Sequence, residues 1–165
     1  MFTLVVLLNQ IYRGMYSKQE SSLLNQEFWT TFGQYMAPIP SAEGEKINWI
    51  NYKTGVRHIR FVLSVENKIA SVSIELSHKN PGEQETCYEK FLSLKATLHR
   101  VTGEPWHWAK MISDQHGKIV SLVSVNQPGL FVLNKTDWPS LISFFKSRLV
   151  ALDEFWCEHK FVFEM

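Results

Sequence analysis

The chain has 165 residues, enough for one domain with a sizeable core, and 45% of them are hydrophobic. Its formal net charge of +1 provides no overall field that would attract nucleic acid or an anionic membrane, so a charged partner must be recognised by a local patch. Cys87 and Cys157 lie too far apart in sequence for a metal knuckle. They are predicted to be free thiols in a reducing compartment.

The first residues of the chain are apolar but form no recognisable targeting segment. Residues 1–8 are too few to span a membrane, and neither a basic region nor a small-residue cleavage site flanks them. Met15 directly precedes a helix start. We therefore expect residues 1–14 to be an N-terminal extension, either upstream of a natural start at Met15 or a short pairing segment. Residues 15–165 are predicted to form a single cytoplasmic α+β domain.

A helix is predicted after Ser17. Ser17 and Glu20 have the spacing of a capping box, in which each side chain bonds the other residue's backbone N–H. Leu24, Phe28 and Phe32 then recur at helical spacing. The helix should end before Pro38.

The most tightly specified element is a β-hairpin over residues 56–78. Apolar residues alternate with polar ones in both arms, which is the period of a strand with one buried face. A two-residue turn at Asn67-Lys68 sets Phe61 opposite Ile74 and Arg60 opposite Glu75. Slipping the register by one residue would lose both matches.

The remaining elements follow in a similar order. A second helix is expected over about 83–101, ended by Gly103, and a second hairpin has arms over 106–113 and 118–125. Residues 130–133 could form an edge strand, Thr136 is predicted to cap a third helix, and residues 161–163 could form a last short strand.

The fold class predicted from this order is α+β, with the sequence α-ββ-α-ββ-α. Two helix-plus-hairpin units in tandem favour a four-stranded, mainly antiparallel sheet with the helices packed on one face. No repeat is visible at the level of residues.

Several short motifs resemble a bacterial family of uncharacterised domains. They are Glu27-Phe28-Trp29 with Phe32-Gly33, Asn48-Trp49 with residues 51–55, Asp137-Trp138-Pro139, and residues 151–156. The similarity runs from Met15 to the C-terminus. In longer relatives this domain resembles a C-terminal module that follows a restriction-endonuclease-like domain. The resemblance implies a setting in nucleic-acid processing or defence, and it supplies no catalytic residues.

The strongest candidate binding segment is 46–60, which contains no carboxylate. Its cations could contact phosphates, and its aromatic rings and amides could contact bases. The candidate nucleic-acid-binding residues are Lys46, Trp49, Tyr52, Lys53, Arg57 and Arg60. The structural alternative is a loop fastened to the sheet, with Trp49 and Tyr52 buried.

Catalytic chemistry has little support in the sequence. Glu75 and Lys79 do not have the spacing of a carboxylate-x-basic nuclease motif, and no aspartate precedes Val72. Asp153, Glu154, Cys157 and His159 form a weak metal-ligand pattern near the end of a helix. We expect no catalytic residues, no cofactor and no metal site.

The predicted function is that of a non-catalytic accessory or binding module that contacts nucleic acid or a partner protein. In the first case Lys53, Arg57 and Arg60 would contact phosphate, while Trp49 or Tyr52 would stack on a base. The alternative is a homo-oligomeric interaction domain without a nucleic-acid role. In that case Trp106 and Trp108, or the first helix, would meet a second copy.

Overall fold

The computed structural model describes residues 16–165. The predicted extension over residues 1–14 lies outside this range. The helices of the described part are α2 (Lys18–Met36), α3 (Pro81–Ser93), α4 (Lys95–Thr102) and α5 (Trp138–His159), with 3₁₀ turns η1 (Lys135–Asp137) and η2 (Lys160–Phe163). The strands are β1 (Ile59–Glu66), β2 (Ile69–Leu76), β3 (His107–Ser113) and β4 (Ile119–Pro128).

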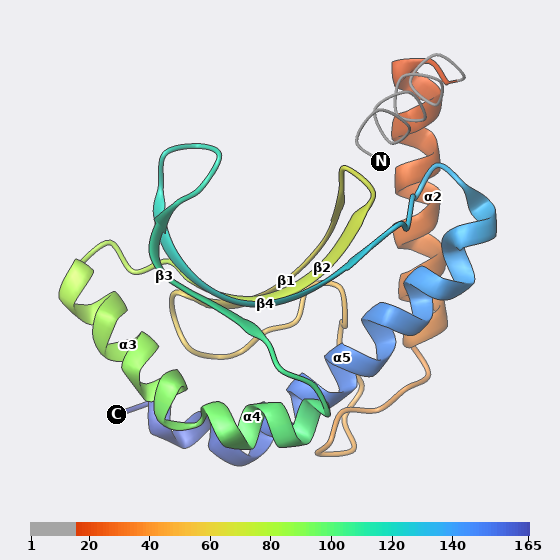
Figure 1. Ribbon diagram of the computed structural model, residues 1–165. Helices are drawn as coiled ribbons and strands as arrows, with labels where there is room; N and C mark the ends of the chain where they lie inside the picture. Colours follow the sequence, from red (N-terminus) through yellow and green to blue (C-terminus); the bar gives the residue numbers. More distant parts are fainter. Residues whose placement is uncertain (1–15) are drawn as a thin grey trace.

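The four strands form one antiparallel sheet in the order β1-β2-β4-β3. The sheet is strongly curved, and α3, α4 and α5 lie along its convex side (Figure 1). The predicted α+β class is therefore confirmed, and the helices pack on one face of the sheet as expected. The register of the first hairpin is also confirmed, with Phe61 opposite Ile74 and Arg60 opposite Glu75.

The core lies between the convex face of the sheet and the helices, and aromatic rings fill much of it. Phe28 and Phe32 of α2 pack against Phe145 of α5 with ring centroids 6.4 and 5.6 Å away. Both α2 residues are fully buried. The capping box at Ser17 and Glu20 forms as predicted and fixes the start of α2.

The predicted second helix is two helices, because the backbone leaves the helical conformation at Leu94 (φ −101°, ψ 9°). No Gly or Pro marks this break. Leu98 of α4, which follows the break, is fully buried. The expected end of the segment is correct, since Gly103 caps α4 with a left-handed backbone.

Three smaller predictions at the C-terminal side are wrong. Residues 130–133 form no strand. The N-cap of α5 is Asp137 rather than Thr136, because the Asn134 side chain accepts from the Thr136 N–H and starts the η1 turn. Residues 161–163 belong to the η2 turn. That turn directs Phe163 onto the ring of Phe91, with a centroid distance of 4.2 Å.

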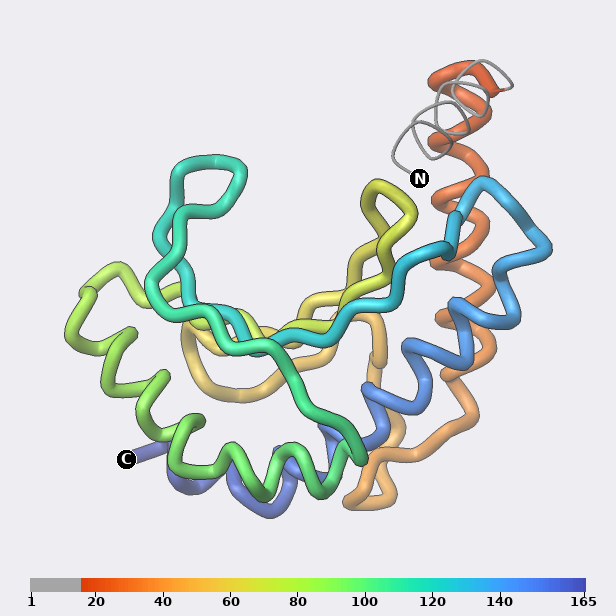
Figure 2. Tube along the Cα trace, in the orientation of Figure 1, coloured from red at the N-terminus to blue at the C-terminus, as the bar shows by residue number. Residues whose placement is uncertain are grey.

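The segment over residues 37–58 connects α2 to β1 and follows an irregular path past α5 (Figure 2). It has no helix or strand, so its backbone must be held by side chains and by other elements. This segment forms most of the candidate site.

Candidate functional site

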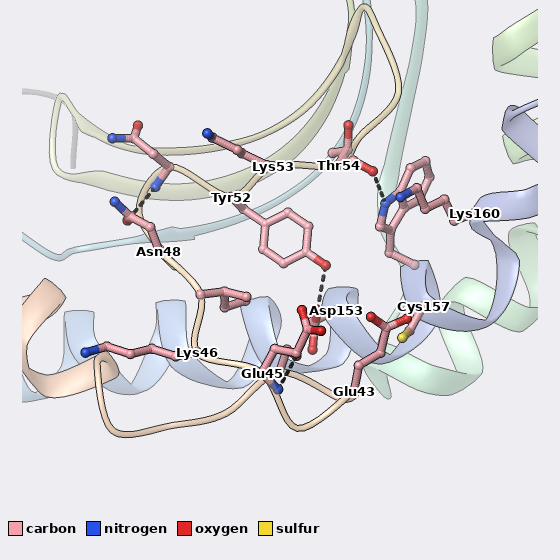
Figure 3. Close-up of a pocket in the computed structure, with 14 residues that line it drawn as sticks. Glu43, Glu45, Lys46, Asn48, Tyr52, Lys53, Thr54, Asp153, Cys157 and Lys160 are labelled. Carbon is pink, nitrogen blue, oxygen red and sulfur yellow. Dashed lines mark hydrogen bonds between the residues drawn. The ribbon is translucent and has the colours of Figure 1, made fainter.

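The candidate site is a pocket of about 470 Å³ between the 41–54 segment and the C-terminal end of α5 (Figure 3). The segment contributes Lys46, Asn48 and Tyr52 to the walls, and the helix contributes Asp153 and Cys157. The volume falls within the range of small-molecule sites.

Asp153 is the main anchor of the pocket. It is 4% exposed, and its two carboxylate oxygens accept hydrogen bonds from the Tyr52 hydroxyl and from the Ala42 N–H, both at 2.6 Å. Burial, followed by the bond to Asp153, raises the pKa of Tyr52, so the phenol stays protonated and donates. This carboxylate therefore ties the segment to α5.

Two tryptophans fasten the rest of the segment. The indole N–H of Trp49 donates to the Ile39 carbonyl at 2.9 Å, and that of Trp156 donates to the Thr54 carbonyl at 2.8 Å. The Thr54 hydroxyl in turn donates to the Ile59 carbonyl at the start of β1. The irregular backbone is therefore held in one conformation from α2 to β1.

Cationic and amide groups gather on one side of the pocket mouth. Lys46 and Lys53 are exposed, and their amines extend toward the same side as the Asn48 amide (Figure 3). The Asn48 side-chain oxygen accepts from the N–H groups of Ile50 and Asn51. Its amide nitrogen is thereby directed outward and can donate to a ligand.

The opposite wall is acidic. Glu43 and Glu45 line it, and Glu43 lies beside the Cys157 thiol (Figure 3). Burial, and then the hydrogen bond and charge of Glu43, raise the pKa of Cys157 to about 11. Cys157 is therefore a protonated thiol near neutral pH.

A second hollow, of about 490 Å³, continues from the pocket along β1. Lys53 borders both hollows, and Arg60 lines only the second. Arg60 pairs with Glu75 at 2.8 Å while its side chain remains 66% exposed. Lys46, Lys53 and Arg60 thus follow one strip of surface, which we call the basic strip. Arg57 is exposed but lines neither hollow.

The aromatic part of the predicted site is placed differently from the cations. Trp49 is 2% exposed, so its ring presents almost no surface on which a base could stack. Tyr52 is half-buried, and its ring stacks on Phe61 with centroids 4.8 Å apart. The fastened-loop alternative therefore describes the aromatic residues, whereas the lysines and arginines remain on the surface.

Sequence reasoning missed several residues of the pocket, among them Glu43, Glu45 and Lys160. Lys160, the first residue of η2, pairs with Glu164 at 3.5 Å. The sequence pattern indicates Asp153 only as a weak metal ligand. Its position four residues after Leu149 and three before Trp156, on the apolar face of the helix, is the available signal of a buried carboxylate. In residues 16–165 no three or more His, Cys, Asp or Glu side chains are grouped to hold a metal ion.

The aromatic residues of the oligomer hypothesis are also less exposed than expected. Trp106 is 5% exposed, and Trp108 is half-buried with its indole N–H donating to His99. Neither forms part of a broad exposed aromatic patch.

Comparisons with known proteins identify the family and nothing more specific. Among the helices of residues 16–165, none combines the length and apolar character that crossing a membrane requires. A search of curated proteins and a search of solved structures each gave no match. Residues 24–160 match the model of a domain of unknown function, DUF4268, and the chain therefore belongs to that family.

Proposed function

We propose that this domain is a non-catalytic accessory module that binds the phosphate backbone of nucleic acid along the basic strip. The observation that carries the proposal is the exposure of Lys46, Lys53 and Arg60 along two hollows that share Lys53, beside the exposed side chain of Asn48. Phosphate oxygens are bound by such cations and amide donors.

The burial of Trp49 refines the proposal. With this ring in the core and the Tyr52 hydroxyl bonded to Asp153, the segment offers few groups that could read bases. Binding through phosphates positions a nucleic acid without reading its sequence. We therefore propose weak, salt-dependent binding with little sequence preference, which suits an accessory role in nucleic-acid processing or defence, the setting implied by the resemblance described above.

The fixed backbone of the segment supports the same function. The hydrogen bonds from Tyr52, Trp49 and Trp156 hold the lysine-bearing segment before any ligand arrives. A preorganised site loses less conformational entropy on binding than a mobile loop does.

The test is a fluorescence-anisotropy titration with labelled single- and double-stranded DNA and RNA, at about 50 mM and about 200 mM salt. Two variants probe the basic strip: the double variant Lys46→Ala with Lys53→Ala, and the single variant Arg60→Ala. The matched control is Arg100→Ala with Lys118→Ala, which removes two exposed cations from α4 and from the β3–β4 turn.

We expect binding that weakens with salt and with both probe variants, and that the control leaves unchanged. For a single strand, losing two phosphate contacts should reduce the slope of log K against log salt by about 1.4. Absence of binding at the lower salt, or equal losses in the probe and control variants, would reject the proposal.

A further inference from the structure

Two histidines meet at the open end of the first hairpin, outside the pocket described above. His58 immediately precedes β1, and His78 follows β2 with Ser77 between them. The Ser77 N–H donates to the His58 carbonyl at 2.9 Å. Their ring centroids are 5.0 Å apart, with an angle of 47° between the planes. The pair is formed by the hairpin register, which brings residues 58 and 78 to the same end.

We propose that His58 and His78 form a two-histidine binding site for a divalent transition metal of the zinc type. With metal–nitrogen bonds of about 2.0–2.1 Å, a metal bound by one nitrogen of each ring lies about 3.2 Å from each centroid. Nitrogen–metal–nitrogen angles of roughly 90–110° then separate the centroids by about 4.5–5.2 Å. The observed 5.0 Å lies within this interval.

The hydrogen bonding of His78 supports the assignment independently. Its Nδ1 atom is buried and has no hydrogen-bond partner among the described residues. Buried polar nitrogens are rarely left in this condition, because an unpaired group loses its bonds to water without replacing them. A metal ion would give this nitrogen the partner that the protein does not supply.

The backbone at both histidines is fixed. His58 has a φ of 67°, in the left-handed region that residues other than Gly adopt infrequently and in which His, Asn and Asp are enriched. The His78 carbonyl accepts from the Gln84 amide of α3 at 3.0 Å, which attaches the second ligand to a helix. Both rings are therefore presented by a rigid framework.

The chemistry of the two imidazole rings determines which cations the site favours. Neutral imidazole is a preferred ligand of zinc, copper and nickel, whereas magnesium and calcium prefer oxygen.

With two protein ligands, the remaining coordination positions would be filled by water or by a bound anion. We therefore expect an open site of moderate affinity rather than a closed structural zinc site. This inference departs from the sequence prediction of no metal site, and it does not depend on the proposed nucleic-acid function.

The test is isothermal titration calorimetry of the full chain with zinc chloride at about pH 7.5, where free histidine is neutral. The probe variants are His58→Asn, which tolerates the left-handed backbone, and His78→Gln. The matched controls are His107→Ala and His116→Ala, which remove exposed histidines. A Cys157→Ser variant tests whether zinc binds instead at the Cys157 thiol. Circular dichroism verifies that each variant folds.

We expect one zinc ion per chain, affinity at least about tenfold weaker in each probe variant, and unchanged affinity in the two histidine controls and in Cys157→Ser. Magnesium should give no saturable heat. Absence of saturable zinc binding would overturn the proposal, as would loss of binding in Cys157→Ser with retention in His58→Asn and His78→Gln.

Discussion

The Tyr52 hydroxyl donates a 2.6 Å hydrogen bond to Asp153, joining the pocket segment to α5 across 101 residues of sequence. Asp153 is buried, and its other oxygen accepts from the Ala42 N–H. One carboxylate thus fastens two points of an irregular segment. The position of the lysines at the pocket mouth depends on this anchor.

Removing the hydroxyl with Tyr52→Phe should destabilise the protein by about 1–3 kcal/mol, because a buried carboxylate oxygen loses its donor. The free energy of unfolding from urea denaturation measures this loss. Tyr35→Phe is the control: Tyr35 is exposed, and its hydroxyl only accepts a 3.4 Å hydrogen bond from Lys146. That change should stay within about 0.5 kcal/mol. Equal effects of the two substitutions would show that the Asp153 bond does not stabilise the segment.

A second prediction concerns the left-handed glycine between the pocket and β1. Gly55 has a φ of 78°, and a Cβ atom there would lie 2.6 Å from the Lys160 amine. Because this amine is the end of a flexible side chain, Gly55→Ala should displace Lys160 from the pocket rim. The strained backbone should additionally cost about 1–2 kcal/mol.

The control for Gly55 is Gly117→Ala in the β3–β4 turn, where φ is 76° and no atom lies within 4 Å of the added Cβ. Both substitutions should lower the free energy of unfolding by similar amounts, since both impose the same backbone strain. Only Gly55→Ala should also change the affinity for the labelled DNA and RNA in the anisotropy titration. An affinity change of the same size in Gly117→Ala would exclude a specific role for the pocket rim.

A third prediction concerns the thiols. Burial raises the pKa of Cys87 to about 11, and burial together with Glu43 raises that of Cys157 to about 11. Removing the Glu43 charge with Glu43→Gln should lower the pKa of Cys157 while its burial remains. A fall of half a unit would increase the thiolate fraction about threefold.

The rate of iodoacetamide labelling at Cys157, followed by peptide mass spectrometry, measures this change because the thiolate is the reactive form. Cys87 is the internal control in the same sample, since it is 7% exposed and Glu43 is not among the groups that shift its pKa. An unchanged labelling rate at Cys157 in Glu43→Gln would contradict the assigned interaction.

Sequence reasoning predicted well where one pattern controlled the outcome. The alternation in residues 56–78 determined both the buried face and the register, because each apolar residue on the core-facing side of β1 has an apolar partner in β2. The break at Leu94 could not be predicted in this way. No Gly or Pro stands at the break, and Leu98, in the helix that follows it, is fully buried.

The candidate site was predicted in part for a similar reason. The charge of Lys46, Lys53 and Arg60 made their exposure predictable. The Trp49 indole is held by a hydrogen bond to the Ile39 carbonyl, ten residues earlier, and the Tyr52 hydroxyl is held by a carboxylate of α5. Such long-range hydrogen bonds leave no local pattern. The predicted register already brings His58 and His78 to the same end of the hairpin, but it does not indicate that their rings meet.

A last prediction concerns pH and the His99 ring of α4. Its Nε2 accepts hydrogen bonds from the Trp106 backbone N–H at 3.1 Å and from the Trp108 indole N–H at 3.2 Å, so this nitrogen must be unprotonated in the folded protein. Burial, followed by the charge of Lys95, lowers the pKa of His99 below its ordinary value of 6.5. Protonation would break both bonds.

The sign of the effect follows from proton linkage. Below pH 6.5 the unfolded chain binds a proton at His99 that the folded protein does not yet bind, so unfolding becomes more favourable as pH falls. The contribution of His99 to stability is therefore complete above pH 6.5 and is lost as pH falls from there toward the lower pKa of the folded state. His78, whose pKa is also lowered, acts in the same direction.

Urea denaturation at about pH 5.5 and about pH 7.5 should therefore give a smaller free energy of unfolding at the lower pH. His99→Gln retains an acceptor oxygen but cannot titrate, so the difference between the two pH values should shrink. His116→Gln, in the exposed β3–β4 turn, should retain the full difference. If His99→Gln and the parent protein lost equal stability on acidification, the hydrogen bonds that His99 accepts from the Trp106 backbone N–H and the Trp108 indole N–H could not be the source of the acid sensitivity. His78 would then be the next residue to substitute.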